Sequence, residues 1–152
     1  MNASPEAPIL IHTTNPATGE TIATYETLDQ NGIDARLETA ARTFRDWRAT
    51  SVPRRTEVLH ALGGLFESQN EELARLAVTE MGKPITQARA EVSKCADLLH
   101  HYAENGPPML ESKRWELSDG GMAEGRWLPL GPVLAVMPWN FPYWQVVRFL
   151  AP

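Results

Sequence analysis

The sequence GPVLAVMPWNFP, residues 131–142, indicates the fold class of this chain more directly than any other segment. Gly131 and Pro132 introduce the apolar run 133–137, which is typical of a parallel strand covered on both faces. A loop follows at 138–141, and Pro142 suits the first turn of a helix that continues from Tyr143. The order strand, loop, helix predicts an α/β fold.

Three helices are predicted before this segment, because apolar residues recur there at steps of three and four. The predicted spans are 32–49, a second helix between the N-cap residue Ser51 and Gly82 with a break near 69–70, and a third from Ile85 to the sequence NGPP at 105–108.

Two pairs of short strands complete the prediction. The first pair, 9–11 and 21–25, flanks a turn at 15–19 and suits a hairpin. The second pair, 113–117 and 124–130, lies between the helical block and the apolar run. A strand pair in that place is expected to project from the domain.

Composition excludes several function classes. The chain has 152 residues, 43% of them hydrophobic, which suffices for one core. Its net charge of −5 and the scattering of Lys and Arg among acidic residues argue against nucleic-acid binding. No apolar run approaches the roughly 20 residues of a membrane span, so none is predicted.

The two chain ends carry further expectations. The first residues lack the basic and apolar blocks of a signal peptide, and a single cysteine cannot build a disulfide framework, so a cytoplasmic location is expected. The last residues, 149–152, lie within an apolar stretch without a polar cap. This predicts that the chain ends within a longer structure.

The third helix carries titratable residues whose simplest roles are structural. Cys95 lies on its apolar stripe, which favours a small buried hydrophobe over a nucleophile. Glu91 and Lys94 are expected on a solvated face with pairs at i,i+3 or i,i+4. The four histidines show no metal-ligand spacing and are expected at the surface or between helices.

Asn140 is the only polar side chain of the loop 138–141. Ligands of open α/β sheets bind beyond the carboxyl ends of parallel strands, where the donors of an Asn amide could stabilise a developing oxyanion. The alternative is that Asn140 caps the following helix, which spacing alone favours.

Three sequences together resemble the aldehyde dehydrogenase family. Residues 131–142 resemble the segment with which these enzymes begin their dinucleotide-binding domain. NPATGE at 15–20, and EMGKP at 80–84 followed by Ala90 and Glu91, resemble the family in its order and at its spacing. The resemblance covers nearly the whole chain and favours the oxyanion role of Asn140 over capping.

The resemblance implies a mechanism and a cofactor. The Asn140 amide is expected to stabilise the oxygen of the thiohemiacetal that forms when a cysteine thiolate attacks the aldehyde, before hydride transfer to the nicotinamide and hydrolysis of the thioester. Trp139 and Asn140 are expected to contact the cofactor, NADP or NAD, with NADP favoured. Simple packing of the Trp139 ring beside Trp144 is the structural alternative.

Arg148 follows Asn140 by eight positions in an apolar neighbourhood, where a guanidinium needs a partner. By resemblance to the family members that oxidise succinate semialdehyde, Arg148 is expected to bind the far carboxylate of the substrate. The alternative is an ion pair with a carboxylate elsewhere in the protein.

The resulting fold prediction is the amino-terminal part of a Rossmann-type cofactor domain. Its parts are a hairpin and helical portion (1–110), a protruding strand pair that the resemblance assigns to oligomerisation (111–130), and the first strand, loop and helix of the dinucleotide-binding domain (131–152). The resemblance also implies homodimers or homotetramers.

The predicted function is oxidation of succinate semialdehyde with NAD(P). The family's nucleophilic cysteine, general-base Glu and cofactor-holding Lys are expected beyond Pro152, so residues 1–152 alone are expected to be inactive. A dehydrogenase of another small aliphatic aldehyde and an inert module that binds partners through its strand pair are the competing hypotheses.

Overall fold

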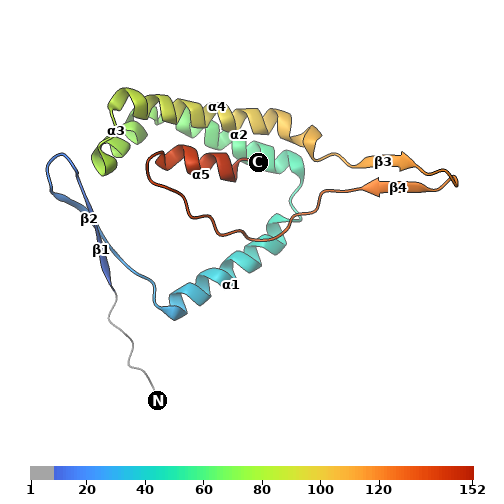
Figure 1. Ribbon diagram of the computed structural model, residues 1–152, viewed down its shortest axis with the longest axis horizontal. Helices are drawn as coiled ribbons and strands as arrows, with labels where there is room; N and C mark the ends of the chain where they lie inside the picture. Colours follow the sequence, from blue (N-terminus) through green and yellow to red (C-terminus); the bar gives the residue numbers. More distant parts are fainter. Residues whose placement is uncertain (1–8) are drawn as a thin grey trace, which may run out of the picture.

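The computed structural model describes residues 9–152, and this part contains five helices and four short strands. Helices α2 to α5 pack together, the β1–β2 hairpin lies beside the end of α3, and α1 and the β3–β4 hairpin extend away from the packed helices (Figure 1). The bounds are β1 Leu10–Thr14, β2 Thr21–Glu26, α1 Gln30–Trp47, α2 Val52–Ser68, α3 Asn70–Met81, α4 Ile85–Met109, β3 Lys113–Glu116, β4 Met122–Gly125 and α5 Pro142–Leu150.

Local sequence signals explain where α2 and α3 begin and end. The Ser51 hydroxyl accepts a hydrogen bond from the Arg54 amide at 3.4 Å, as expected of an N-cap. Gln69 ends α2, and α3 starts at once, which confirms the predicted break. Gly82 ends α3 with φ of 70°, a left-handed conformation that glycine adopts without a Cβ clash.

Helix α4 forms the centre of the packed helices. Its buried face carries the small residues Ala88, Ala96 and Ala103, which allow neighbouring helices to approach closely. Cys95 and Leu99 of α4 form the core with Val147 and Ala151 at the end of the chain. Because α5 packs directly on α4, Asn140 and Phe141 just before α5 lie near the same helix.

The predicted parallel strand at 133–137 is wrong for the described part of the chain. These residues adopt no regular structure, and Leu134 and Val136 are 90% and 87% exposed. A parallel strand needs a hydrogen-bonded neighbour, and both sheets within residues 9–152 are two-stranded antiparallel hairpins.

Three smaller predictions also need correction. Helix α4 continues through the NGPP sequence to Met109, with Pro107 and Pro108 in its last turn, where each proline fixes φ near its helical value and forgoes one backbone hydrogen bond. Strand β4 ends at Gly125, so 126–130 lies outside it. Helix α1 begins at Gln30 after the N-cap Asp29, and its predicted apolar stripe stays largely exposed, with Ile33 and Leu37 at 42% and 63%.

Two glycines provide a matched test of the helix boundaries. Gly82→Ala should destabilise the chain by about 1–2 kcal/mol, because an added Cβ disfavours positive φ and lies 3.2 Å from the Pro16 ring. Gly64→Ala, in the interior of α2 with open space around it, should stabilise by about 0.5–1 kcal/mol. Urea unfolding of both variants measures the difference, and effects of the same sign would contradict the assigned cap.

Candidate active site

The turn at 138–141 leads into α5 without a capping side chain of its own. Phe141 is the N-cap residue, and no side chain of the turn accepts a hydrogen bond from α5. Pro142 has no amide hydrogen, so the first donors that require an acceptor are the amides of Tyr143 and Trp144. The alternative that Asn140 caps the helix is therefore not realised.

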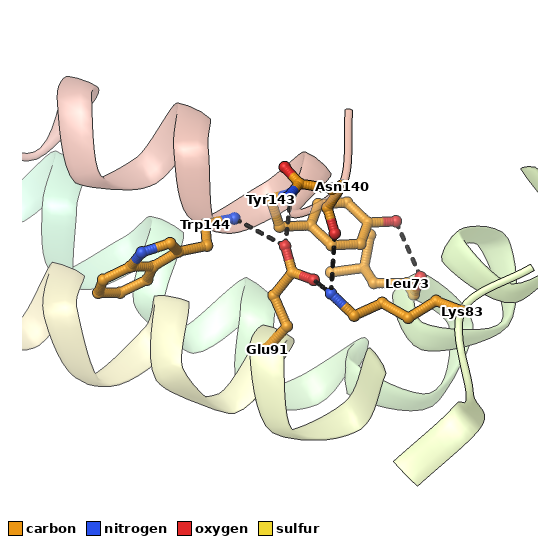
Figure 2. Close-up of polar contacts among 6 residues, drawn as sticks. All are labelled: Leu73, Lys83, Glu91, Asn140, Tyr143 and Trp144. Carbon is orange, nitrogen blue, oxygen red and sulfur yellow. Dashed lines mark hydrogen bonds and ion pairs between the residues drawn. The ribbon is translucent and has the colours of Figure 1, made fainter. Parts of the chain in front are cut away.

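The carboxylate of Glu91, on α4, caps α5 instead. One oxygen, Oε1, accepts hydrogen bonds from the amides of Tyr143 at 3.0 Å and Trp144 at 2.9 Å (Figure 2). These amides are the second and third of the helix, the ones that an N-cap side chain would normally bind. The negative charge of the carboxylate also interacts favourably with the positive end of the helix dipole.

Lys83 neutralises Glu91 and holds the preceding turn. Its ammonium pairs with Oε2 of Glu91 and donates to the carbonyl oxygen of Asn140 at 3.3 Å (Figure 2). The same Nζ lies 3.7 Å from the centre of the Phe141 ring. Lys83 and Glu91 are each only 4% exposed. The pair thus contacts the backbone on both sides of Phe141.

The solvated face predicted for Glu91 is wrong, because α5 covers that face of α4. Ala88, Glu91, Val92 and Cys95 are spaced three, one and three apart and share the buried side of the helix. The sequence signal for the burial of Glu91 was its place among apolar residues on one face of the helix. No spacing rule predicts its ion pair with Lys83. Lys94 is exposed as expected, with its ammonium 3.8 Å from the centre of the Trp144 ring.

Tyr143 fastens α5 to α3. Its hydroxyl donates to the carbonyl of Leu73 at 2.8 Å (Figure 2), and its ring meets the edge of Phe66 at 6.0 Å between centroids. Burial raises the pKa of the Tyr143 hydroxyl, with a further contribution from the negative Glu91. The first turn of α5 is thereby fixed to two other helices.

A groove of about 560 Å³ runs between α4 and this turn. Its lining includes Asn140 and Phe141 of the turn, Trp144 and Gln145 of α5, and Gln87 and Lys94 of α4. The groove therefore combines aromatic surface, amide groups and a cation.

The two other predicted site residues, Trp139 and Arg148, are both exposed. Trp139 is 76% exposed and does not pair with Trp144 among the described aromatic contacts, so the packing alternative is not supported. Arg148 is exposed one helical turn beyond Trp144, and none of the ion pairs formed within residues 9–152 includes it.

Cys95 lies inside the core, which confirms its prediction as a small buried hydrophobe. Burial, with a smaller contribution from the charge of Glu91, raises the pKa of its thiol to about 12. A thiol in this state is not a nucleophile at neutral pH.

Two of the four histidines lie between helices. His60 of α2 and His100 of α4 face each other with their Nδ1 atoms 3.1 Å apart, which confirms an interhelical place for these two. No group of three or more His, Cys, Asp or Glu within residues 9–152 could hold a metal ion. None of the helices described is both long and apolar enough to cross a bilayer.

Comparisons with known proteins agree on one family. The sequence profile of the aldehyde dehydrogenase family matches residues 3–152. Succinate semialdehyde dehydrogenase [NAD(P)+] Sad of Escherichia coli is 46% identical over 138 residues, which cover 91% of this chain and 30% of that enzyme. Succinate-semialdehyde dehydrogenase [NADP(+)] 1 of Mycobacterium tuberculosis is 43% identical over 144 residues, covering 93% and 32%.

Solved structures share the fold. The succinic semialdehyde dehydrogenase of Streptococcus pyogenes, solved with NADP+, matches with a TM-score of 0.86 and 32% identity over 92% of this chain and 31% of that one. The chain thus spans about 30% of the length of the curated relatives it matches.

The buried thiol provides a test of the core. Cys95 should react with Ellman's reagent at pH 8 at least about a hundredfold more slowly in the folded chain than in 8 M urea, because an exposed cysteine has a pKa near 8.5. A Cys95→Ser variant gives the background, since the chain holds one cysteine. Fast labelling of the folded chain would contradict the burial of Cys95 and make it a candidate nucleophile again.

Proposed function

The chain belongs to the aldehyde dehydrogenase family, and on that premise we propose that it forms the amino-terminal part of the catalytic unit of an NAD(P)-dependent succinate-semialdehyde dehydrogenase. Relatives at 43–46% identity bear that name with NADP(+) or NAD(P)+. The nucleophilic thiolate comes from a segment other than residues 1–152, because Cys95, the one cysteine, is buried and un-ionised. This chain supplies the oxyanion donor and one wall of the substrate site.

The observation that carries the proposal is the free amide of Asn140. Glu91 occupies the capping position of α5, so the Asn140 side chain forms no hydrogen bond within residues 9–152 and lines the groove. Its two N–H donors are available to an oxygen that gains charge as the thiolate attacks the aldehyde. A fixed donor stabilises the transition state without reorganising at the moment of reaction.

The exposed turn fits a cofactor that lies beside it. Trp139 stands free of the described core, so its backbone and ring can line a cleft shared with the remainder of the enzyme. When bound, NADP or NAD supplies the hydride acceptor. In this proposal Trp139 and Asn140 orient the cofactor toward the groove.

Arg148 is proposed to bind the substrate's far carboxylate. It lies on α5 one turn past Trp144 and Gln145, which line the groove, and has no carboxylate partner within residues 9–152. An unpaired guanidinium is suited to bidentate binding of a carboxylate.

Assembly through the β3–β4 hairpin completes the proposal. The hairpin projects from the packed helices (Figure 1), and Trp115 and Met122 are exposed on it. We assign this region to formation of a homodimer or homotetramer in the complete, cytoplasmic enzyme.

The oxyanion role is tested by Asn140→Ala in a dehydrogenase that carries residues 1–152. Loss of one fixed donor should lower kcat by roughly 10²–10³ while the thermal unfolding temperature is retained, because the residue does not cap α5. Unchanged kcat together with a loss of about 1 kcal/mol of stability would instead identify a helix cap.

The substrate assignment is tested by Arg148→Leu in the same enzyme. Charge-assisted hydrogen bonds contribute roughly 1.5–3 kcal/mol, so kcat/KM for succinate semialdehyde should fall at least about tenfold. Butanal lacks the carboxylate and is the matched substrate, whose kcat/KM should change little. A parallel loss for both aldehydes would mean that Arg148 belongs to a structural ion pair.

A further inference from the structure

We propose that the buried pair Lys83 and Glu91 is the positioning device of the Asn140 amide, a role that rests on the oxyanion function proposed above. Neither residue needs to contact substrate. Both act by fixing the backbone from which the Asn140 side chain extends.

The pair holds the backbone on both sides of the residue that separates Asn140 from α5. Lys83 Nζ donates to the carbonyl oxygen of Asn140 at 3.3 Å, and Glu91 Oε1 accepts from Tyr143 and Trp144 at 3.0 and 2.9 Å. Lys83 and Glu91 also form an ion pair with each other, so the backbone contacts at Asn140 and at Tyr143 and Trp144 are connected through one network (Figure 2). Rotation of the turn would break at least one of these bonds.

Glu91 also prevents a competing state of Asn140. The amides of Tyr143 and Trp144 are the usual partners of a capping side chain, and Asn is among the preferred capping residues. If Glu91 did not occupy them, a shift of the turn by one residue could bring the Asn140 carboxamide to these donors and withdraw it from the groove. Supplying the cap from α4 therefore keeps the amide available.

The charges of the pair matter because both are buried. A carboxylate that is 4% exposed is stabilised only by its partners, here one ammonium and two amides. Neutralising one member of the pair leaves the other as an uncompensated buried charge. The remaining charged side chain would then move toward water and displace the turn 138–141 that it holds. A displacement on the order of 1 Å at a reacting group can reduce the rate by about a hundredfold.

The kinetic test uses Lys83→Met and Glu91→Gln in a dehydrogenase that carries residues 1–152, with kcat expressed per active site from burst titration. Each variant should lower kcat at least about tenfold with KM changed less than about twofold, because the oxyanion forms only during reaction. The matched control is Glu71→Gln. Glu71 pairs with Arg89 at 2.7 Å across α3 and α4, is half exposed and does not touch the turn, so kcat should stay the same.

A second measurement on the chain itself avoids reliance on activity. Amide hydrogen exchange at Tyr143 and Trp144 should accelerate at least about tenfold in Glu91→Ala, while the buried amide of Leu99 in α4 stays protected and Glu71→Gln exchanges as the native chain does. Unchanged exchange at both amides would overturn the proposal, as would variants whose kcat per active site equals that of the native enzyme.

Failure of the proposed function is distinguishable from failure of this inference. If Asn140→Ala leaves kcat unchanged, the oxyanion role itself is wrong. If Asn140→Ala lowers kcat but Lys83→Met and Glu91→Gln do not, the donor is real and the pair does not position it.

Discussion

The hydrogen bonds from the Glu91 carboxylate to the first free amides of α5 are the interaction on which the site depends. The turn before α5 offers no capping group, and Pro142 offers no amide hydrogen, so the helix requires an acceptor from another element. Glu91 provides it from the buried face of α4. The Tyr143 hydroxyl and the core contacts of Val147 also hold α5 in place, but the capping of its first amides and the freedom of the Asn140 amide follow from the Glu91 carboxylate.

Three separate sequences meet at this point of the structure. Gly82 turns the chain at the end of α3 and is followed directly by Lys83. Glu91 follows two turns into α4, and the turn 138–141 closes over both side chains. EMGKP, the pair Ala90 and Glu91, and PWNFP were recognisable as a family pattern. The structure adds the physical reason for their co-occurrence, because each supplies one part of a single buried network.

Sequence reasoning succeeded where the signal was local and failed where it depended on a distant partner. The cap at Ser51, the stop at Gly82 and the burial of Cys95 follow from short-range spacing and residue chemistry. The strand at 133–137 depends on a neighbouring strand that the described residues do not contain. The burial of Glu91 depends on α5, which lies more than 50 residues later, and local periodicity carries no information about such a contact.

A double-mutant cycle on kcat tests most directly whether Glu91 affects the chemistry through Asn140. Glu91→Gln should lower kcat at least about tenfold when Asn140 is present, and by less than about twofold in the Asn140→Ala background, since the group that it positions is then gone. Equal factors in the two backgrounds would show that the two residues act independently and would contradict a positioning role of Glu91.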